Sequence, residues 1–535
     1  MDAQALPRTQ APEDCYPALV ARDARFDGLW FVGVTSTGIY CRPVCRVRTP
    51  KRENCLFFAS AAQAEAANFR PCLKCRPELA PREDGPARWS VMDASRTLAR
   101  QAAEWLDACD DPEASVEQLA DRLGITSRHL RRIFAAEHGV TPLQYLQTRR
   151  LLLAKQLLTD TALPVAQVAL AAGFGSVRRF NAAFAQHYRL QPGQLRREMP
   201  AAVSACGEPA LRLAYRPPYA VEAMLQFLAD RAIPGVEAVD LAARRIERSL
   251  RLQHRGEILQ GRLTLSFDRE QPLVLLSPCS ALWNASAALI PLVRRWLDLD
   301  ARPDAIDRRL GQLAEQEPGL RLPGCCDRFE LAVRAVLGQQ VTVAAARTLA
   351  GRLVARFGAP LPEDQCSPQV TRLFPRPDVL AGAEVSAIAE LGIIRQRAEA
   401  LIAIARAWPE LAFARGEGPP QQALDGLVAL PGIGPWTAHY MLMRGWSWPD
   451  IFPPGDIVLR RRLSPDAQQP LPSARISEQA AERFQPYRSY AVLRLWRQAA
   501  LDGPARRRPA AAVPANPSAD APSPRARRHA LPQER

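Results

Sequence analysis

The stretch Leu430-Pro-Gly-Ile-Gly-Pro-Trp-Thr-Ala438 carries the sharpest structural signal in this 535-residue sequence. It predicts a helix that ends near Leu430, a hairpin turn at Gly432 and Gly434, and a new helix that begins near Pro435. Backbone N–H groups beside such a helix N-terminus form a phosphate-binding site. The alternative interpretation is an ordinary glycine turn between two helices.

A carboxylate follows this hairpin, and it narrows the interpretation. Asp456 stands in the Gly- and Pro-rich sequence Phe452-Pro-Pro-Gly-Asp-Ile-Val-Leu-Arg460. A hairpin followed by such a loop resembles the helix-hairpin-helix DNA glycosylases, and the chain most resembles DNA-3-methyladenine glycosylase II (AlkA) over about residues 211–498. The resemblance includes the motifs Tyr215-Arg-Pro-Pro-Tyr219, Leu320-Arg-Leu-Pro-Gly-Cys325 and Ala335-Val-Leu-Gly-Gln-Gln340, and also Trp496.

The AlkA resemblance implies a reaction. An N3- or N7-alkylated purine such as 3-methyladenine is already cationic and leaves readily once its nucleotide is flipped out of the duplex. Asp456 matches the family's catalytic carboxylate, which stabilises the oxocarbenium-like sugar and positions water. Trp436, Tyr440 and Trp496 match aromatic positions that would stack on the cationic base, and Phe227 is a further candidate. Ordinary core packing is the alternative for each aromatic residue.

Three positions refine this resemblance. Glycosylases that also cut the strand place a nucleophilic Lys just after the hairpin, where this chain has Trp436. The resemblance therefore implies a monofunctional enzyme that leaves an abasic site. Gln340 stands where a related glycosylase has a Leu that wedges into the duplex. Ile457 replaces an aromatic residue beside the catalytic Asp.

Four cysteines cluster near the other end of the chain, as Cys41-x3-Cys45 and Cys72-x2-Cys75. Two close thiolate pairs suit one tetrahedral zinc ion, which stabilises a module too small for a large core. A purely structural zinc site is the common alternative.

The sequence around the cysteines, from Phe31 to Asn54 and from Phe69 to Pro77, resembles the N-terminal domain of the adaptive-response protein Ada. The resemblance covers about residues 13–80 and implies that Cys41 irreversibly accepts a methyl group from a DNA phosphotriester, the other three cysteines completing the zinc site. Zinc keeps the sulfur as a thiolate, which is the nucleophilic form. Arg46, Arg48 and Arg70 would hold the DNA backbone, although each can equally be a solvated surface charge.

The region between these ends has the rhythm of two helix-turn-helix units. The first spans Val116–Ala136 and the second Val165–Gln186, where Ala172-Gly-Phe-Gly-Ser-Val-Arg-Arg-Phe180 resembles the signature of the AraC-type DNA-binding domain. The resemblance covers about residues 95–197 and implies two recognition helices in successive major grooves. Its candidate base-reading residues are Arg128, Arg131, Arg178 and Asn181. A generic helical bundle is the alternative.

Charge and composition are consistent with a nucleic-acid partner. The net charge is +15, of which the segment Gly503–Arg535 supplies +5 through seven Arg, one Asp and one Glu. No apolar run is long enough for a transmembrane helix, and the N-terminus lacks the features of a signal peptide. We therefore expect a cytoplasmic, nucleoid-associated protein without membrane contact. Its expected partners are double-stranded, alkylated and promoter DNA, with RNA polymerase as a further candidate.

These features predict a multidomain chain with a small α/β zinc module, an all-α double helix-turn-helix, an α+β domain and an all-α helix-hairpin-helix domain. The predicted ranges are 1–82 for the zinc module, 83–94 for a linker, 95–197 for the AraC-type domain, 198–210 for a second linker, 211–290 for the AlkA N-terminal domain, 291–501 for the glycosylase domain and 502–535 for a disordered basic tail.

The favoured interpretation is a bifunctional repair and regulatory protein, in which methyl transfer to Cys41 activates sequence-specific transcription and the C-terminal half excises damaged bases. The alternative is a transcription activator whose glycosylase half binds DNA but is inactive. The presence of Asp456 favours the enzyme.

Overall fold

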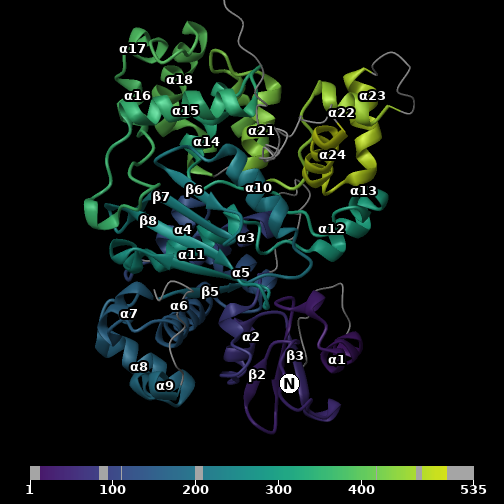
Figure 1. Ribbon diagram of the computed structural model, residues 1–535. Coiled ribbons are helices and arrows are strands. Elements are labelled where there is room, and N and C mark those ends of the chain that lie inside the picture. The colour runs from purple at the N-terminus through teal and green to yellow at the C-terminus, as the bar shows by residue number, and fades with distance from the viewer. Residues whose placement is uncertain are drawn as a thin grey trace, which may run out of the picture.

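The structure is a computed structural model that describes residues 12–82, 94–109, 111–198, 209–416, 419–464 and 473–502. The predicted linkers at 83–94 and 198–210 and the predicted tail at 502–535 lie almost wholly outside these residues, so those predictions stay untested. Within the described ranges, no helix has the length and apolar character that crossing a membrane requires. Figure 1 shows the N-terminal sheet at the bottom, a larger sheet in the middle and the C-terminal helices at the top.

The N-terminal module is a four-stranded sheet with the order β3-β1-β2-β4. β1 and β2 form an antiparallel hairpin, and β4 lies parallel to β2, so that the segments carrying the cysteine pairs are neighbours. This arrangement confirms the predicted small α/β module. Its elements are α1 (Pro12–Ala21), β1 (Phe31–Val34), β2 (Ile39–Cys41), β3 (Cys55–Phe58), α2 (Ala61–Ala66) and β4 (Arg70–Pro71).

The two predicted helix-turn-helix units are present, joined by the long helix α6. In the first unit Gly124 adopts a left-handed φ of 67°, which permits the tight turn. The sequence offers Thr126 or Ser127 as the cap of the next helix, and the Thr126 hydroxyl takes this role by accepting a hydrogen bond from His129 N–H. The helices are α3 (Ala94–Ala108), α4 (Val116–Arg122), α5 (Ser127–His138), α6 (Pro142–Asp160), α7 (Val165–Ala171), α8 (Val177–Tyr188) and α9 (Pro192–Glu198).

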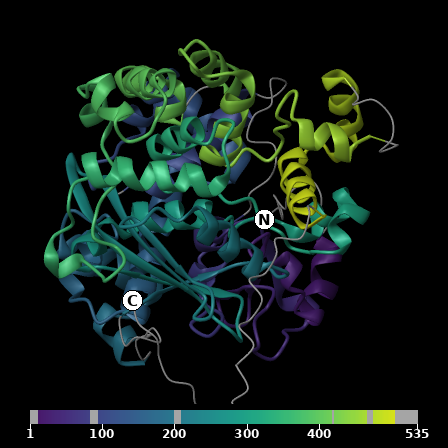
Figure 2. The ribbon, with the colours of Figure 1, turned by 45° about the horizontal axis from the view of Figure 1, so that its top comes forward.

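An antiparallel sheet with the order β5-β9-β8-β7-β6 follows. The sequence predicts strands at Leu211–Tyr215, Arg262–Phe267 and Leu273–Leu276, which β5, β8 and β9 match, whereas it predicts none at β6 and β7. Figure 2 shows these strands running beneath the green helices of the C-terminal region. The elements are β5 (Leu211–Ala214), α10 (Val221–Arg231), β6 (Glu237–Asp240), β7 (Arg245–His254), β8 (Glu257–Phe267), β9 (Leu273–Pro278) and α11 (Ser286–Trp296).

The remaining chain is helical and encloses a large apolar core. As predicted, a helix begins at Pro435 directly after the glycine hairpin, and α20 precedes that hairpin. The helices are α12 (Pro303–Leu310), α13 (Gln312–Glu315), α14 (Arg328–Leu337), α15 (Val343–Phe357), α16 (Pro377–Ala381), α17 (Val385–Ala389), α18 (Arg395–Ala407), α19 (Ala412–Arg415), α20 (Pro420–Val428), α21 (Pro435–Gly445), α22 (Ile457–Arg462), α23 (Ala474–Ala481) and α24 (Arg488–Asp502).

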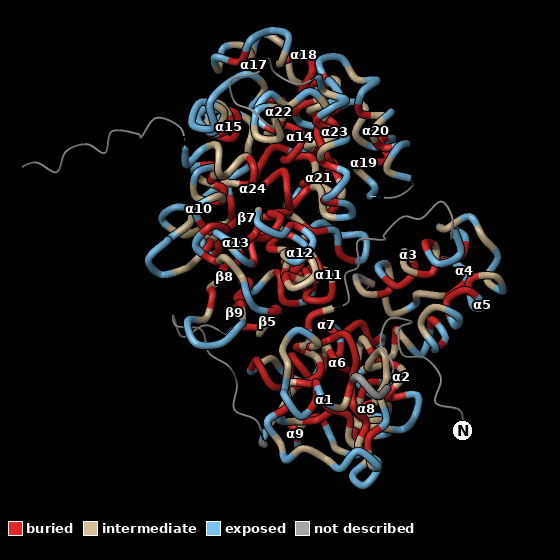
Figure 3. The backbone as a smooth tube through the Cα atoms, turned by 90° about the vertical axis from the view of Figure 1, so that its right-hand side faces the viewer, coloured by how far each residue is buried: buried red, intermediate tan, exposed pale blue. Residues whose placement is uncertain are grey.

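The second helix-turn-helix unit shares a hydrophobic core with the five-stranded sheet. Buried side chains from α6 to α8, such as Leu157 and Phe180, belong to the same cluster as Leu211 and Leu265 of the sheet. The Gln156 amide also donates to the backbone carbonyl of Arg212 at 2.8 Å. Figure 3 shows buried backbone in red in both parts. The predicted domain boundaries stay predictions, but the packing of these two parts is continuous.

Buried ion pairs dock the zinc module onto α6. Arg76 Nη1 donates to Asp160 Oδ1 at 2.6 Å, and Lys155 Nζ donates to Glu78 Oε2 at 2.5 Å. All four side chains are almost completely buried. A different docking would leave buried charges without partners, so these pairs fix the orientation of the module.

Arg216 joins the zinc module to the C-terminal half. Its side chain is buried and its guanidinium donates to four backbone carbonyls, those of Asp27 at 2.8 Å, Asp300 at 2.6 Å, Arg82 at 2.7 Å and Pro81 at 3.3 Å. Desolvation lowers the pKa of Arg216 to about 10, although Asp300 and Asp27 oppose this shift. The residue therefore remains a cation at neutral pH.

A second titratable group is buried between α2 and α6. Glu65 accepts hydrogen bonds from the Tyr40 hydroxyl and the Thr148 hydroxyl, both at 2.9 Å, and His187 Nε2 lies 3.6 Å from it. Burial raises the pKa of Glu65 to about 8, against the opposing effects of Thr148, Tyr40 and Lys155. The native protein therefore holds this carboxyl largely protonated at neutral pH.

Replacing Arg216 by Met should lower the free energy of unfolding by about 2–5 kcal/mol, because buried carbonyls lose their donor. Urea denaturation followed by circular dichroism measures this loss. Arg269→Met is the matched control, since Arg269 is exposed and donates to the carbonyl of Ala242 within the same sheet region. Equal stability of the two variants would show that Arg216 does not hold the joint.

Glu65 should make the protein less stable as the pH rises from about 5 to about 8. The native carboxyl keeps its proton above the usual pKa of 4.5, so the stabilisation is complete below that value and is lost as the pH passes the native pKa of about 8. The free energy of unfolding should fall by at most about 1.4 kcal/mol per pH unit. Denaturation of wild type and Glu65→Gln at each pH measures this slope. The difference between the free energies of unfolding of the two proteins removes the contribution of His187. Parallel stability profiles would contradict this prediction.

Candidate active site and metal centre

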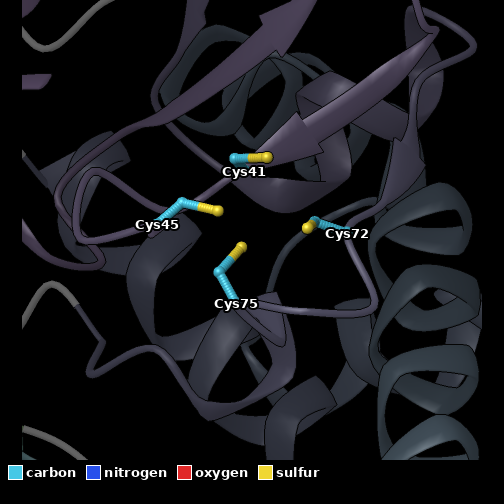
Figure 4. Close-up of side chains that lie close together, drawn as sticks. All are labelled: Cys41, Cys45, Cys72 and Cys75. Atoms are coloured by element: carbon cyan, nitrogen blue, oxygen red, sulfur yellow. The ribbon is translucent and has the colours of Figure 1, made fainter. Parts of the chain in front are cut away.

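The four clustered cysteines form a metal centre. Cys41 ends β2, Cys45 follows in the next loop, and Cys72 and Cys75 lie just after β4. Their sulfur atoms all lie within 4.8 Å of one another, and Figure 4 shows them pointing toward a common centre. Four converging thiols with this spacing fit tetrahedral zinc, which is the cofactor of this site.

The surroundings of the four sulfurs differ. The backbone N–H of Arg42 donates to Cys75 Sγ at 3.4 Å. Its guanidinium binds the Cys75 carbonyl at 3.1 Å and the carboxylate of Asp27 at 2.8 Å. Within the described part of the chain, no backbone donor is found for the sulfur of Cys41.

The arginines predicted to hold the DNA backbone lie near this centre. Arg46 and Arg48 are exposed, and Arg70 in β4 is half-buried. Among the described residues, none of these three has an ion-pair partner. Their charges are therefore available to a phosphate group.

The predicted base-reading residues of the helix-turn-helix units fall into two groups. Arg128 and Arg178 are exposed on α5 and α8. Arg131, however, forms an ion pair with Glu117 at 2.8 Å. Asn181 is half-buried, and its side-chain oxygen is buried without a hydrogen-bond partner. The sequence did not predict either of these two environments.

The predicted glycosylase residues surround one cavity of about 660 Å³. It lies among α10, α14, α15, α21 and α24 and combines aromatic, acidic and basic side chains. The structure thus brings together residues far apart in the sequence. The predicted members in its wall are Phe227, Trp436, Tyr440, Asp456 and Trp496.

Asp456 is held at the wall of this cavity by both of its oxygens. Oδ1 accepts the backbone N–H of Leu459 at 2.8 Å and so caps helix α22. Oδ2 accepts the indole N–H of Trp436 at 2.8 Å and that of Trp496 at 3.2 Å. Two indoles and a helix end therefore fix the carboxylate in one orientation.

The aromatic side chains offer flat faces to a ligand. The rings of Trp436 and Tyr440 are stacked, with centroids 5.5 Å apart and an interplanar angle of 7°. Arg444 donates to the Tyr440 hydroxyl at 2.8 Å, and its guanidinium lies 4.7 Å from the ring of Phe227. Burial alone would raise the pKa of Tyr440, but Arg444 and Arg231 outweigh it and lower the pKa. Sequence reasoning missed Arg444, although its four-residue spacing from Tyr440 on a predicted helix was a usable signal.

The glycine hairpin and a neighbouring loop form the rim beside the cavity. Gly432 and Gly434 are exposed, and Gly432 has a left-handed φ of 77°. A Cβ atom on Gly432 would lie 2.9 Å from the Ala400 methyl group, so only glycine fits there. Gln340 is also exposed and has a left-handed φ of 54°.

Family models match four successive parts of the chain. The model for the metal binding domain of Ada matches residues 14–78, and a helix-turn-helix domain model matches residues 119–198. The AlkA N-terminal domain model matches residues 210–327. The model for HhH-GPD superfamily base excision DNA repair proteins matches residues 333–486. Their order agrees with the order of domains that the sequence predicts.

Related proteins show the same combination. The chain is 38% identical over 498 residues to a probable bifunctional transcriptional activator/DNA repair enzyme AlkA of Mycobacterium tuberculosis, covering 90% of this chain and 96% of that protein. It is 38% identical over 288 residues to DNA-3-methyladenine glycosylase 2 of Escherichia coli, covering 53% and 95%. It is 37% identical over 135 residues to the bifunctional transcriptional activator/DNA repair enzyme Ada of Escherichia coli, covering 25% and 35%. The chain belongs to the family of bifunctional transcriptional activators and DNA repair enzymes that join an Ada-type zinc domain and an AraC-type helix-turn-helix domain to an AlkA-type DNA glycosylase.

Proposed function

We propose that the C-terminal half releases alkylated purines such as 3-methyladenine from DNA, with Asp456 as the catalytic residue. The observation that carries this proposal is the carboxylate held by two indole N–H groups in the wall of an aromatic cavity. The hairpin at Gly432 and Gly434 would grip the DNA backbone through its exposed N–H groups. The flipped base would then enter the cavity.

The reaction follows from the charges. A base alkylated at N3 or N7 is a cation, so it stacks favourably on the faces of Trp436 and Tyr440 and leaves with the electron pair of its bond to the sugar. The sugar becomes positively charged as that bond breaks. Asp456 stabilises this charge and orients the water that adds to the sugar carbon. The residue after the hairpin is Trp436, which cannot form a Schiff base, so the product is an abasic site in an uncut strand.

Asp456→Asn should reduce base release from methylated DNA by at least about a hundredfold, because the amide lacks the negative charge that the sugar requires. The assay measures free base and abasic sites under single-turnover conditions. Affinity for an undamaged duplex should be unchanged. Full activity in this variant would contradict the assignment. No activity in the wild type would favour a transcription activator with an inactive glycosylase half.

We also propose that Cys41 accepts a methyl group from a methylated backbone phosphate. Zinc, when bound, keeps the sulfur as a thiolate. The Cys41 sulfur bonds to the methyl carbon as the bond from that carbon to the phosphate oxygen breaks, and the phosphodiester leaves with the electron pair. The backbone N–H of Arg42 donates to Cys75 Sγ and makes that sulfur a weaker nucleophile, whereas Cys41 has no such donor among the described residues. Arg46, Arg48 and Arg70 would bind the neighbouring phosphates.

Methylation would turn the repair event into a signal. It removes one negative charge from the metal centre, and this loss reduces repulsion toward DNA phosphates. The helix-turn-helix units would then bind promoter DNA, with Arg128 and Arg178 as base-reading residues and RNA polymerase as a protein partner. We propose that this happens at the nucleoid in the cytoplasm, and that the zinc, helix-turn-helix, sheet and glycosylase domains have the boundaries predicted from the sequence.

Exposure of the protein to a duplex with a methyl phosphotriester should leave one methyl group on Cys41. Peptide mass spectrometry locates the group, and Cys41→Ser should carry none. Because loss of a zinc ligand can unfold the module, zinc content and circular dichroism are measured on the same samples. A methyl group on Cys45, Cys72 or Cys75 of the wild type would refute the assignment.

A further inference from the structure

The loop between α14 and α15 is tied to the glycine hairpin by one side chain. The amide nitrogen of Gln339 donates to the carbonyl of Gly432 at 2.9 Å and lies 3.2 Å from the hydroxyl of Thr437, to which it also donates. Gly432 belongs to the hairpin, and Thr437 lies in the first turn of α21. A single amide thus connects the loop to both sides of the turn.

Helix α18 supports the same two segments. Arg397 of α18 donates to the backbone carbonyl of Gln339. The hairpin packs against α18 at Ala400, where a side chain on Gly432 would collide. The loop and the hairpin therefore rest on a common base, and the Gln339 amide sets the spacing between them.

The tip of this loop is exposed and lies beside the cavity. Gln340 is exposed and holds a left-handed φ of 54°, and Val341 beside it is 36% exposed and lines the cavity. Such a backbone conformation is costly for a non-glycine residue and persists only where its surroundings impose it. Directly before Gln340, the contacts of Gln339 with the hairpin and of Arg397 with the Gln339 carbonyl hold the backbone of this loop.

We propose that Gln339 is a positioning residue for base extrusion. It holds the Gln340 tip at a fixed distance from the hairpin, so that the tip enters the base stack when the hairpin binds the phosphate. This inference rests on the proposed phosphate-binding role of the hairpin. Without the tie, the hairpin would still bind DNA, but the tip would no longer meet the stack at the required place, and extrusion would be slow.

The test uses the full-length protein and a duplex that carries one 7-methylguanine with 2-aminopurine as its neighbour. Gln339→Leu keeps the side-chain size and removes both hydrogen bonds. Duplex affinity should change by less than about twofold, because phosphate contacts dominate it. The rise in 2-aminopurine fluorescence on binding should be lost, and single-turnover base release should fall by about ten- to a hundredfold.

Two further variants keep the test decisive. Gln421→Leu is the matched control, since Gln421 is an exposed glutamine on α20 that donates to Asp425, and it should behave as the wild type. If Gln339→Leu has a lower melting temperature, Arg397→Met decides, because it releases the same loop from α18 and should give the same loss of fluorescence. Unchanged fluorescence and base release at full duplex binding, or a loss of affinity as large as the loss of rate, would overturn the proposal. An inactive wild type that still binds the duplex would instead refute the proposed function.

Discussion

The guanidinium of Arg216 is the contact on which the arrangement of the zinc module and the glycosylase half depends. Its four carbonyl partners come from the zinc module and from the turn after α11. Because the buried guanidinium donates to all four carbonyls, only one arrangement of these parts satisfies it. Asp27, which offers its carbonyl to Arg216, uses its carboxylate to bind Arg42. Arg42 in turn contacts Cys75. A continuous series of polar contacts therefore runs from the metal centre to the scaffold of the glycosylase.

In the cavity of the glycosylase half, the acidic and basic side chains are directed at different partners. The carboxylate of Asp456 faces indole N–H groups, while the guanidinium of Arg444 is directed at a phenol oxygen and an aromatic face. The Asp456 carboxylate is thereby kept apart from the arginine side chains that share its cavity. Among the described residues it forms no ion pair. A carboxylate without an ion pair beside aromatic faces attracts a cationic ligand and a developing positive charge, whereas Arg248, Arg334 and Arg444 of the cavity wall are engaged by protein groups. The selectivity for charged bases that we propose follows from this separation.

Local signals in the sequence predicted local features well. The Gly-Ile-Gly-Pro sequence at 432–435 fixes a hairpin because its glycines and proline act within a few residues, and the cysteine spacing fixes the metal centre for the same reason. The strands β6 and β7 escaped prediction, partly because the turn after β7 has Arg255 with a positive φ of 50°, where Asn or Asp is the usual signal. The contacts of Arg216 and Gln339 could not be predicted, since their partners lie between 84 and 189 residues away in the chain. The pairing of Arg131 with Glu117 is likewise visible only once α4 and α5 have been placed.

Helix α6 determines how the metal centre can affect DNA binding. Its C-terminal end holds the zinc module through Asp160, and its length joins the two helix-turn-helix units whose spacing determines how recognition helices meet successive grooves. In the methylation signal that we propose, the module is already fixed on α6 by buried charges, so a loss of charge at Cys41 would not need to move a domain to change affinity for DNA. It changes the potential on a surface already held beside the first helix-turn-helix unit, where Gln63 of α2 donates to the carbonyl of His138 at 3.0 Å. The proposed methylation would lower the electrostatic repulsion between the thiolate centre and DNA phosphates without a domain movement, because the module is rigidly docked.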